Sequence, residues 1–495
     1  MTVQRSDSKP VRQAADRLCG FVNPFAASVV ALIASGSLAL PVSAQSIKEA
    51  LTQAYRTNPQ LDAQRAGLRS TDEEVSQANA TYRPTVNSTT TSSWTRTDSR
   101  PPIAATQGET HPRSMQFDIT QPIFRGFQSL NQVRVAEANV RSGRELLRSV
   151  EQNVLLLAAT AFMDIVRDQE TIRIRENNVK VLNNQLRATR DQFAVGEVTR
   201  TDVAQAEARV AESVAALEVA RGTLRTNRGL YERLVGSPPG TLSDPGEPSR
   251  MLPKSLPEAN SIASRENPFI VQALYQEQAA RYQVERIRGQ LLPQINLQAQ
   301  YTRSFDSSRT VDLSDQRSIQ TRMTMPIYSG GSIESQVRAA KHTHVQRIQQ
   351  IEQQRTEQLA LVVGAWARHS SAKAQGISTA AAIRANQTAL TGVREEYRVG
   401  QRTLLDVLNA EQALLNSQLD QINARRTAVV EAYTLLQTIG RLSATELVLG
   451  AEAYDPEINY FEVRRKWFGL NITHSDGRHE KVDASWEPVT HRPTK

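Results

Sequence analysis

The feature that most constrains this chain is an internal duplication. The stretch FAVGEVTRTDV, which begins at Phe193, and the stretch YRVGQRTLLDV, which begins at Tyr397, share V-G, T and D-V at a separation of 204 residues. QPIFRG from Gln121 and MPIYSG from Met325 match at the same separation. We therefore expect two copies of one large unit, residues 45–236 and 255–440, rather than a short-period solenoid.

Each copy has the same internal order. A helical pattern ends at a proline (Pro84, Pro293), and alternation of apolar and polar residues, the pattern of a half-buried strand, follows. The strands are expected at about 82–98 and 114–124 in the first copy and at about 293–305 and 316–328 in the second.

Very long helical patterns follow each strand pair, at 126–236 and 330–440. Each breaks once at a V-G pair, and the helix before that break would be about 105 Å long. Seven-residue spacing of apolar positions predicts coiled-coil packing of the returning helices. The stripes are Val203, Val210, Leu217, Leu224 and Tyr231 in one copy and Leu408, Leu415, Ile422, Val429 and Leu436 in the other.

The N-terminus reads as an export signal. Arg12 and Arg17 precede a short apolar stretch, and small residues lead to a predicted cleavage between Ala44 and Gln45, so that 1–44 is the signal peptide. A membrane anchor is the alternative, but the apolar run is short for a span. Cys19 is the only cysteine, so the mature chain can form neither disulfides nor thiolate metal sites.

Composition argues against several classes of function. The net charge of +8 is spread along helical faces without a basic run, so nucleic-acid binding is not expected. The sequence holds no phosphate loop, nucleophile elbow or zinc motif, and the neighbouring His342 and His344 point to different helix faces. We expect no enzyme activity, no cofactor and no metal, and any energy source must lie in another protein.

The strands raise a problem of closure. Four strands per chain cannot form a barrel, and an open sheet edge cannot stand in lipid. If these strands enter a membrane, several chains must share one barrel. The alternative is a non-transporting periplasmic coiled-coil scaffold that bears β-hairpins.

Both V-G breaks carry the signals of a helical U-turn. Gly196 and Gly400 can adopt positive φ and end a helix. Thr199 with Asp202, and Thr403 with the aspartate three residues on, form the capping-box pattern of a helix start.

The duplicated spacing, P-I-F/Y-x-G before each long helix and Y/F-x-V-G-x-x-T-x-x-D at each turn resemble the TolC family of outer-membrane channel-tunnels over roughly 46–455. The resemblance implies an α+β membrane protein: a homotrimer with a twelve-stranded β-barrel in outer-membrane lipid and an α-helical barrel extending into the periplasm. It implies a passive exit duct for proteins or small toxic compounds. Its partners would be a periplasmic adaptor protein and an inner-membrane pump, either of the ABC type or a proton-driven pump of the RND type.

The resemblance also implies a gate at the U-turns. Tyr397 and Arg402 would constrain it, with Asp202 as the partner of Tyr397 and the backbone of Thr201 as acceptor for Arg402. Asp406 would line the pore as a ring of three carboxylates. The family pattern has a second acid one turn later, where this chain has Asn409, so weaker cation selectivity is expected.

The exposed tips are also the candidates for adaptor docking, at Val195, Gly196 and Thr199 and at Val399, Gly400 and Thr403. By the same resemblance, residues 237–254 and 441–468 would form an equatorial collar. Residues 469–495 read as a flexible tail.

Overall fold

The computed structural model describes residues 45–98, 107–308, 310–447 and 453–472. These belong to a single unit, Ala44–Lys495. The predicted signal peptide, with Cys19 and Ala44, and most of the predicted tail lie outside the described residues.

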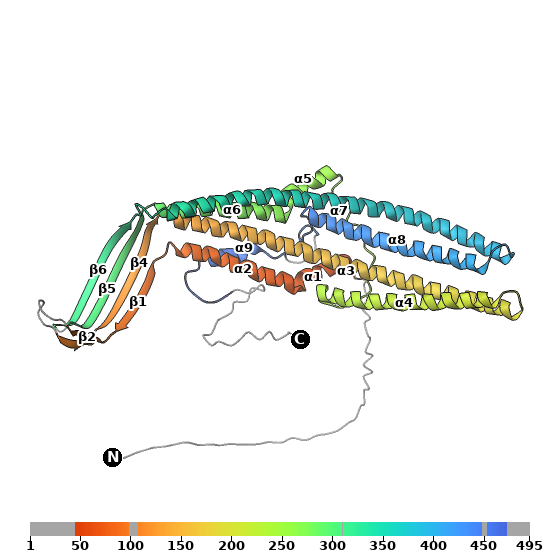
Figure 1. Cartoon of the computed structure of the whole chain (residues 1–495), viewed down its shortest axis with the longest axis horizontal. Helices are drawn as coiled ribbons and strands as arrows, with labels where there is room; N and C mark the ends of the chain where they lie inside the picture. The colour runs from red at the N-terminus through yellow and green to blue at the C-terminus, as the bar shows by residue number, and fades with distance from the viewer. Residues whose placement is uncertain (1–44, 99–106, 309, 448–452, 473–495) are drawn as a thin grey trace, which may run out of the picture. The chain divides into compact units, whose positions relative to one another are not determined.

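The two copies have nearly the same element order (Figure 1). The first copy contains α1 (Ile47–Thr57), α2 (Pro59–Ala80), β1 (Thr85–Ser92), β2 (Thr95–Asp98), β3 (Gln107–Thr110), β4 (Arg113–Arg125), α3 (Gln128–Ala194) and α4 (Arg200–Val235). The second contains α5 (Leu256–Glu266), α6 (Pro268–Arg288), the 3₁₀ turn η1 (Gly289–Leu291), β5 (Gln294–Ser308), β6 (Val311–Thr324), α7 (Ser332–Arg398) and α8 (Leu404–Thr438). Helix α9 (Pro456–Arg464) follows.

Two strand predictions need correction. The strand expected over 82–98 is broken after Ser92 into β1 and β2, and β2 pairs only with β3 in a separate sheet. The strand expected over 316–328 lies at Val311–Thr324. It ends before Pro326, which has no N–H for the ladder, and the positive φ of Gly330 then redirects the chain into α7.

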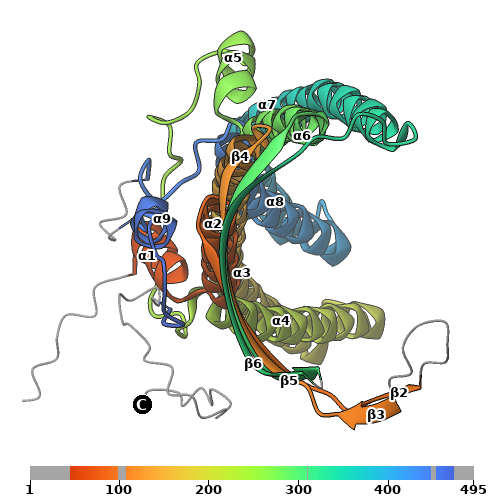
Figure 2. The same ribbon diagram turned by 90° about the vertical axis from the view of Figure 1, so that its left-hand side faces the viewer.

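The main sheet has four antiparallel strands in the order β1-β4-β5-β6, and Figure 2 shows that it is curved. The register places Ile119 between Val86 and Ala299, and Ala299 opposite Ile319. The next residues along, Asn87, Asp118, Gln300 and Ser318, form the neighbouring polar row. Because side chains alternate across a strand, one face of the sheet is largely apolar and the other polar.

The duplication extends to single hydrogen bonds. Asn58 caps α2 and also donates from Nδ2 to the carbonyl of Leu234 at 3.1 Å. Asn267 caps α6 and donates in the same way to Thr438, 204 residues after Leu234, at 2.9 Å. Each Asn-Pro pair therefore fastens a short helix to the end of the returning long helix of its own copy.

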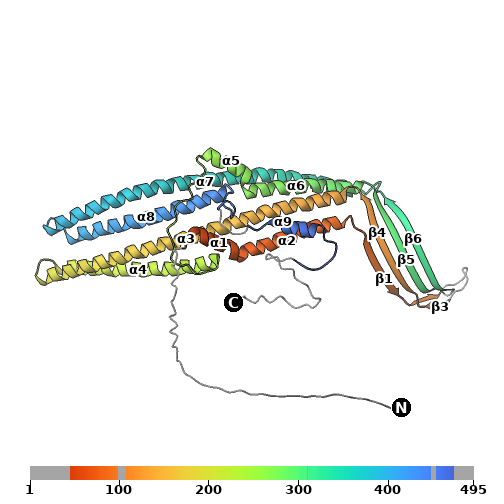
Figure 3. The ribbon, with the colours of Figure 1, turned by 180° about the vertical axis from the view of Figure 1, so that it is seen from behind.

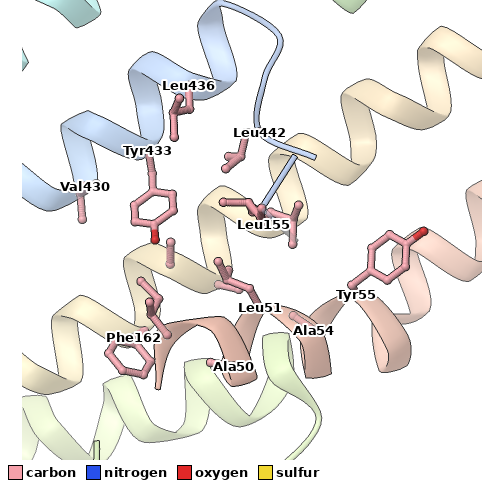
Figure 4. Packing of buried hydrophobic residues seen from close by; sticks show 14 of the residues in the cluster. Ala50, Leu51, Ala54, Tyr55, Leu155, Phe162, Val430, Tyr433, Leu436 and Leu442 are labelled. Atoms are coloured by element: carbon pink, nitrogen blue, oxygen red, sulfur yellow. The ribbon is translucent and has the colours of Figure 1, made fainter. Parts of the chain in front are cut away.

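Helices α3 and α7 contain 67 residues each, about 100 Å of helix. The central core packs between α1, α3 and α8, where Figure 4 shows Leu51, Phe162 and Tyr433 close together. Among the described residues one helix, α3, holds an 18-residue stretch apolar enough to span a membrane, and 56% of that stretch is buried inside the molecule. That burial is typical of a core helix.

Candidate functional site at the helical hairpin tips

Both U-turns have the same glycine-centred geometry. In the first, Gly196 has φ +80° and donates to the carbonyl of Phe193 at 3.0 Å, while Glu197 donates to that of Gln192 at 2.9 Å. These two bonds define a Schellman motif. The second turn repeats both at 3.0 and 2.9 Å around Gly400, whose φ is +76°. A left-handed conformation favours glycine, so the V-G pair is explained by helix termination alone.

The predicted capping boxes are present at both turns. Asp202 Oδ2 accepts from the Thr199 amide at 2.9 Å and from its hydroxyl at 2.7 Å, and the Asp202 amide donates back to Oγ1 at 3.3 Å. Thr403 and Asp406 repeat this arrangement at 3.0, 2.8 and 3.3 Å. Hydrogen bonds from the Thr403 backbone and side chain lower the pKa of Asp406. Its Oδ1 accepts no hydrogen bond from the described residues, so this oxygen is available to a ligand or ion.

A small apolar cluster joins the two hairpins behind the tips. Its buried members are Leu182, Leu186, Ala206, Leu404 and Leu408, and Val203, Val210 and Tyr397 pack against them. The heptad positions thus bring the hairpins together, as expected for coiled-coil packing.

Tyr397 lies at this contact, and in the described chain its hydrogen-bond partner is not the predicted Asp202. Its hydroxyl donates to Gln192 Oε1 at 3.2 Å. Burial raises the pKa of Tyr397, and the nearby negative charge of Asp202 raises it further. The capping box uses Asp202 Oδ2, and neither carboxylate oxygen of Asp202 accepts a hydrogen bond from Tyr397 in the described chain.

Arg402 also differs from the prediction. Its Nε donates to Glu396 Oε2 at 2.8 Å, within the second turn, and no bond to Thr201 forms in the described chain. Both Arg402 and Thr201 are exposed. Glu396 lies six residues before Arg402 on the same turn, so the arginine pairs within its own hairpin and not with the other one.

Asn409 makes another polar contact between the hairpins near their tips. Its Oδ1 accepts from Arg209 Nη2 at 3.5 Å. Sequence reasoning missed Gln192, Arg209 and Glu396. For two of them a signal was available, because Gln192 and Glu396 occupy matching positions of the duplication.

The proposed docking residues form open surface. Val195 and Val399 are 73% and 70% exposed, and a Cβ built on Gly196 or Gly400 would meet no atom within 4 Å. Figures 1 and 3 show both turns at the ends of their long helices, away from the sheet. Within the part of the chain that the structure describes, no group of three or more metal-ligating side chains occurs.

The comparisons with known proteins agree with this architecture. The outer membrane efflux protein family matches residues 50–236 and 260–441, which are the two copies of the duplicated unit. The chain belongs to this family of TolC-like outer-membrane channels, which extend into the periplasm. Its relatives are channel proteins rather than enzymes.

Among curated relatives, the outer membrane efflux protein BepC of Brucella suis is 37% identical, over 88% of this chain and 93% of its own length. The alkaline protease secretion protein AprF of Pseudomonas aeruginosa is 26% identical over 62% of this chain and 65% of its own. The outer membrane protein TolC of Vibrio cholerae is 22% identical over 84% and 95%.

Solved structures show the same fold at low identity. The outer-membrane channel CmeC of Campylobacter jejuni superposes with a TM-score of 0.72 at 15% identity, over 85% of this chain and 89% of that one. The outer membrane protein VceC of Vibrio cholerae gives 0.69 at 18%, over 80% and 96%.

Proposed function

We propose that this chain is the outer-membrane exit duct of a tripartite export system, closed at rest by its hairpin tips. The observation that carries the proposal is the sheet. Four strands with one apolar and one polar face continue directly into helices of 67 residues. Apolar side chains stand exposed on that face in the single chain, with Ile319 at 80% and Val86 at 65%. Lipid is the environment that matches such a face.

The sheet edges call for further copies. Strands β1 and β6 each have one hydrogen-bonded neighbour in the described chain, so one side of each is open. An unpaired edge within lipid costs several kcal/mol per group, about the cost of an unmade buried hydrogen bond. Three copies of a four-stranded sheet supply twelve strands, and closure of that sheet supports the homotrimer.

Exposed aromatic side chains mark the junction of sheet and helices. Tyr82 is 48% exposed, Phe127 57% and Tyr328 84%. Tyrosine and related rings favour the boundary between lipid and water. This belt supports a membrane edge at the junction, with the long helices in the periplasm.

The tips supply the gate. Tyr397 and Gln192 tie one hairpin to the other, Arg402 and Glu396 stiffen the second turn, and Asp406 keeps one carboxylate oxygen free. Threefold symmetry would place three such carboxylates around the axis, an arrangement that favours cations. Adaptor docking falls to the exposed surface around Val195 and Val399.

The partners follow from the family. Channels of the TolC type work with a periplasmic adaptor and an inner-membrane pump. The names of relatives include both efflux and protease secretion, so an RND-type and an ABC-type pump are both compatible with this duct. We propose no cofactor and no catalytic activity for it.

Extraction and mass measurement test the duct. Membranes containing the chain are washed with salt and alkali, extracted with detergent, and the extracted species is weighed by light scattering with the detergent subtracted. The proposal expects release only by detergent and a mass of three chains, with discrete conductance steps in a planar bilayer. A species that stays soluble without detergent and never conducts would instead be the periplasmic scaffold.

A further inference from the structure

The segment that follows α9 exposes large apolar side chains. Trp467 is 59% exposed, Phe468 87% and Leu470 82%. On α9 itself, Ile458 and Phe461 lie three residues apart, on one helix face, and are 60% and 59% exposed. Single exposed apolar side chains are normal on a protein surface, but a contiguous group of them marks a contact surface.

This segment is fastened beside the sheet. Asn79 Nδ2 donates to the carbonyl of Arg464 at 3.4 Å, and Arg83 Nη1 donates to that of Lys466 at 2.9 Å. The Arg83 guanidinium also lies 4.7 Å from the centroid of the Trp467 ring. Arg83 comes two residues before the start of β1, so the segment is held at the junction of helices and sheet, as Figures 1 and 3 allow the reader to follow.

Charge is concentrated on the same segment. Residues 464–472 contain three cations, Arg464, Arg465 and Lys466, and no acid. Arg464 pairs with Glu137 at 3.4 Å, while Lys466 Nζ donates to the carbonyl of Asn471. The positive φ of Gly469, +109°, bends the chain between Phe468 and Leu470.

We propose that residues 464–472, the junction segment, bind the phospholipid headgroup zone of the periplasmic leaflet beside the β-barrel. The inference rests on the proposed function for the position of the membrane. Tryptophan and phenylalanine suit the boundary between headgroups and acyl chains, and the neighbouring cations suit anionic headgroups. The occupant is lipid because the segment continues the belt of Tyr82, Phe127 and Tyr328 at the same junction.

Site-specific labels test the contact in the full chain. In a Cys19→Ser background, which has no other cysteine, single cysteines replace Phe468, Ile319 and Val219. These side chains are 87%, 80% and 70% exposed, so none of the replacements removes a core residue. Each variant carries an environment-sensitive fluorophore and is reconstituted into phosphatidylethanolamine–phosphatidylglycerol vesicles that contain a nitroxide-bearing phospholipid.

The inference expects lipid quenching at 468 and 319 and none at 219 on α4. Quenching at 319 without quenching at 468 would overturn the junction-segment contact and leave the duct intact. Quenching at neither site would overturn the proposed function, and this inference with it. A label at 468 that is shielded from water yet unquenched by lipid would show a protein partner instead, such as a second copy, and would overturn the inference.

A charge variant tests the headgroup contribution. Arg465 forms no ion pair within the described chain, and Arg465→Gln with the label at 468 removes a single charge near the surface. We expect about a fivefold weaker local association with anionic vesicles, rescued by Arg465→Lys. The loss should vanish in phosphatidylcholine vesicles. An equal loss in both lipids would contradict a role for anionic headgroups.

Discussion

Arg394 and Glu411 form a 2.8 Å ion pair that joins α7 to α8 near the second hairpin tip. The first hairpin repeats it 204 residues earlier, where Arg190 and Glu207 pair at 2.6 Å. The environments differ. The side chain of Glu411 is only 5% exposed, whereas that of Glu207 is 49% exposed. The second copy therefore buries this carboxylate, whereas the first copy leaves it half exposed.

This difference predicts unequal costs for two matched substitutions. Arg394→Ala leaves the buried Glu411 without its cation and should destabilise the tip locally by about 1–3 kcal/mol. Arg190→Ala removes an exposed pair and should cost less than about 1 kcal/mol. Amide hydrogen exchange in the last turns of α7 and α3 measures both. Equal exchange rates in the two variants would refute the distinction.

Two glycines with positive φ predict a second contrast. A Cβ at Gly440 would collide with the carbonyl group of Glu266, whereas one at Gly196 would meet open space. Gly196→Ala should lower the free energy of unfolding only by the strain of a left-handed backbone at alanine, about 1–2 kcal/mol. Gly440→Ala adds a clash with backbone and should exceed about 4 kcal/mol, with a sharp fall in folded yield. Similar thermal midpoints would show that the chain relaxes around Gly440.

The ion pair between Glu266 and Arg441 predicts a pH dependence. Arg441 donates two hydrogen bonds, at 2.8 and 2.9 Å, and lowers the pKa of Glu266. A depressed pKa in the folded state means that its contribution is present above the ordinary glutamate pKa of about 4.3 and is lost as pH falls through the lower folded value.

Glu266→Gln should therefore destabilise the protein at neutral pH, and its difference from wild type should shrink below about pH 4. Chemical unfolding midpoints across the acid range measure this. Asp420→Asn, at an exposed position in the middle of α8, is a control for the change in net charge. A difference that is constant with pH would exclude the ion pair as its source.

The contact between Asn409 and Arg209 predicts how the cation selectivity of the channel can be raised. Asn409 Oδ1 accepts from Arg209, so Asn409→Asp would form an ion pair that cancels the new charge. Asn409→Asp combined with Arg209→Gln should raise cation selectivity and block by multivalent cations, while Asn409→Asp alone changes them little. Reversal potentials in a salt gradient distinguish the two. Equal shifts in both variants would show that Arg209 does not neutralise position 409.

The sequence was sufficient for features that repeat or obey local rules. The V-G turns and the capping boxes at Thr199 and Thr403 follow from backbone conformation and neighbouring hydrogen bonds, and all are present. The alternation of apolar and polar residues predicted the apolar face of the sheet. It did not predict the break between β1 and β2 after Ser92, because β1 contains no proline or glycine that would mark one.

The partners of the tip side chains could not be predicted in this way. Whether the hydroxyl of Tyr397 reaches Gln192 or Asp202 depends on the relative rotation of two long helices, which the sequence does not specify. A local partner also competed for Arg402, because Glu396 lies on its own turn. Such choices are made in tertiary packing, where several acceptors of similar chemistry compete.

The most direct test is single-channel conductance of the mature protein beside the double variant Tyr397→Phe with Arg402→Ser. The double variant removes the hydroxyl that binds Gln192 and the cation that holds Glu396, so conductance should rise while the protein remains folded. Arg398→Ser, which removes a neighbouring cation paired with Glu395 on its own helix, is the matched control and should leave conductance unchanged. Steps of equal size in wild type and double variant would contradict a gate at the tips, and absence of any steps would contradict the duct.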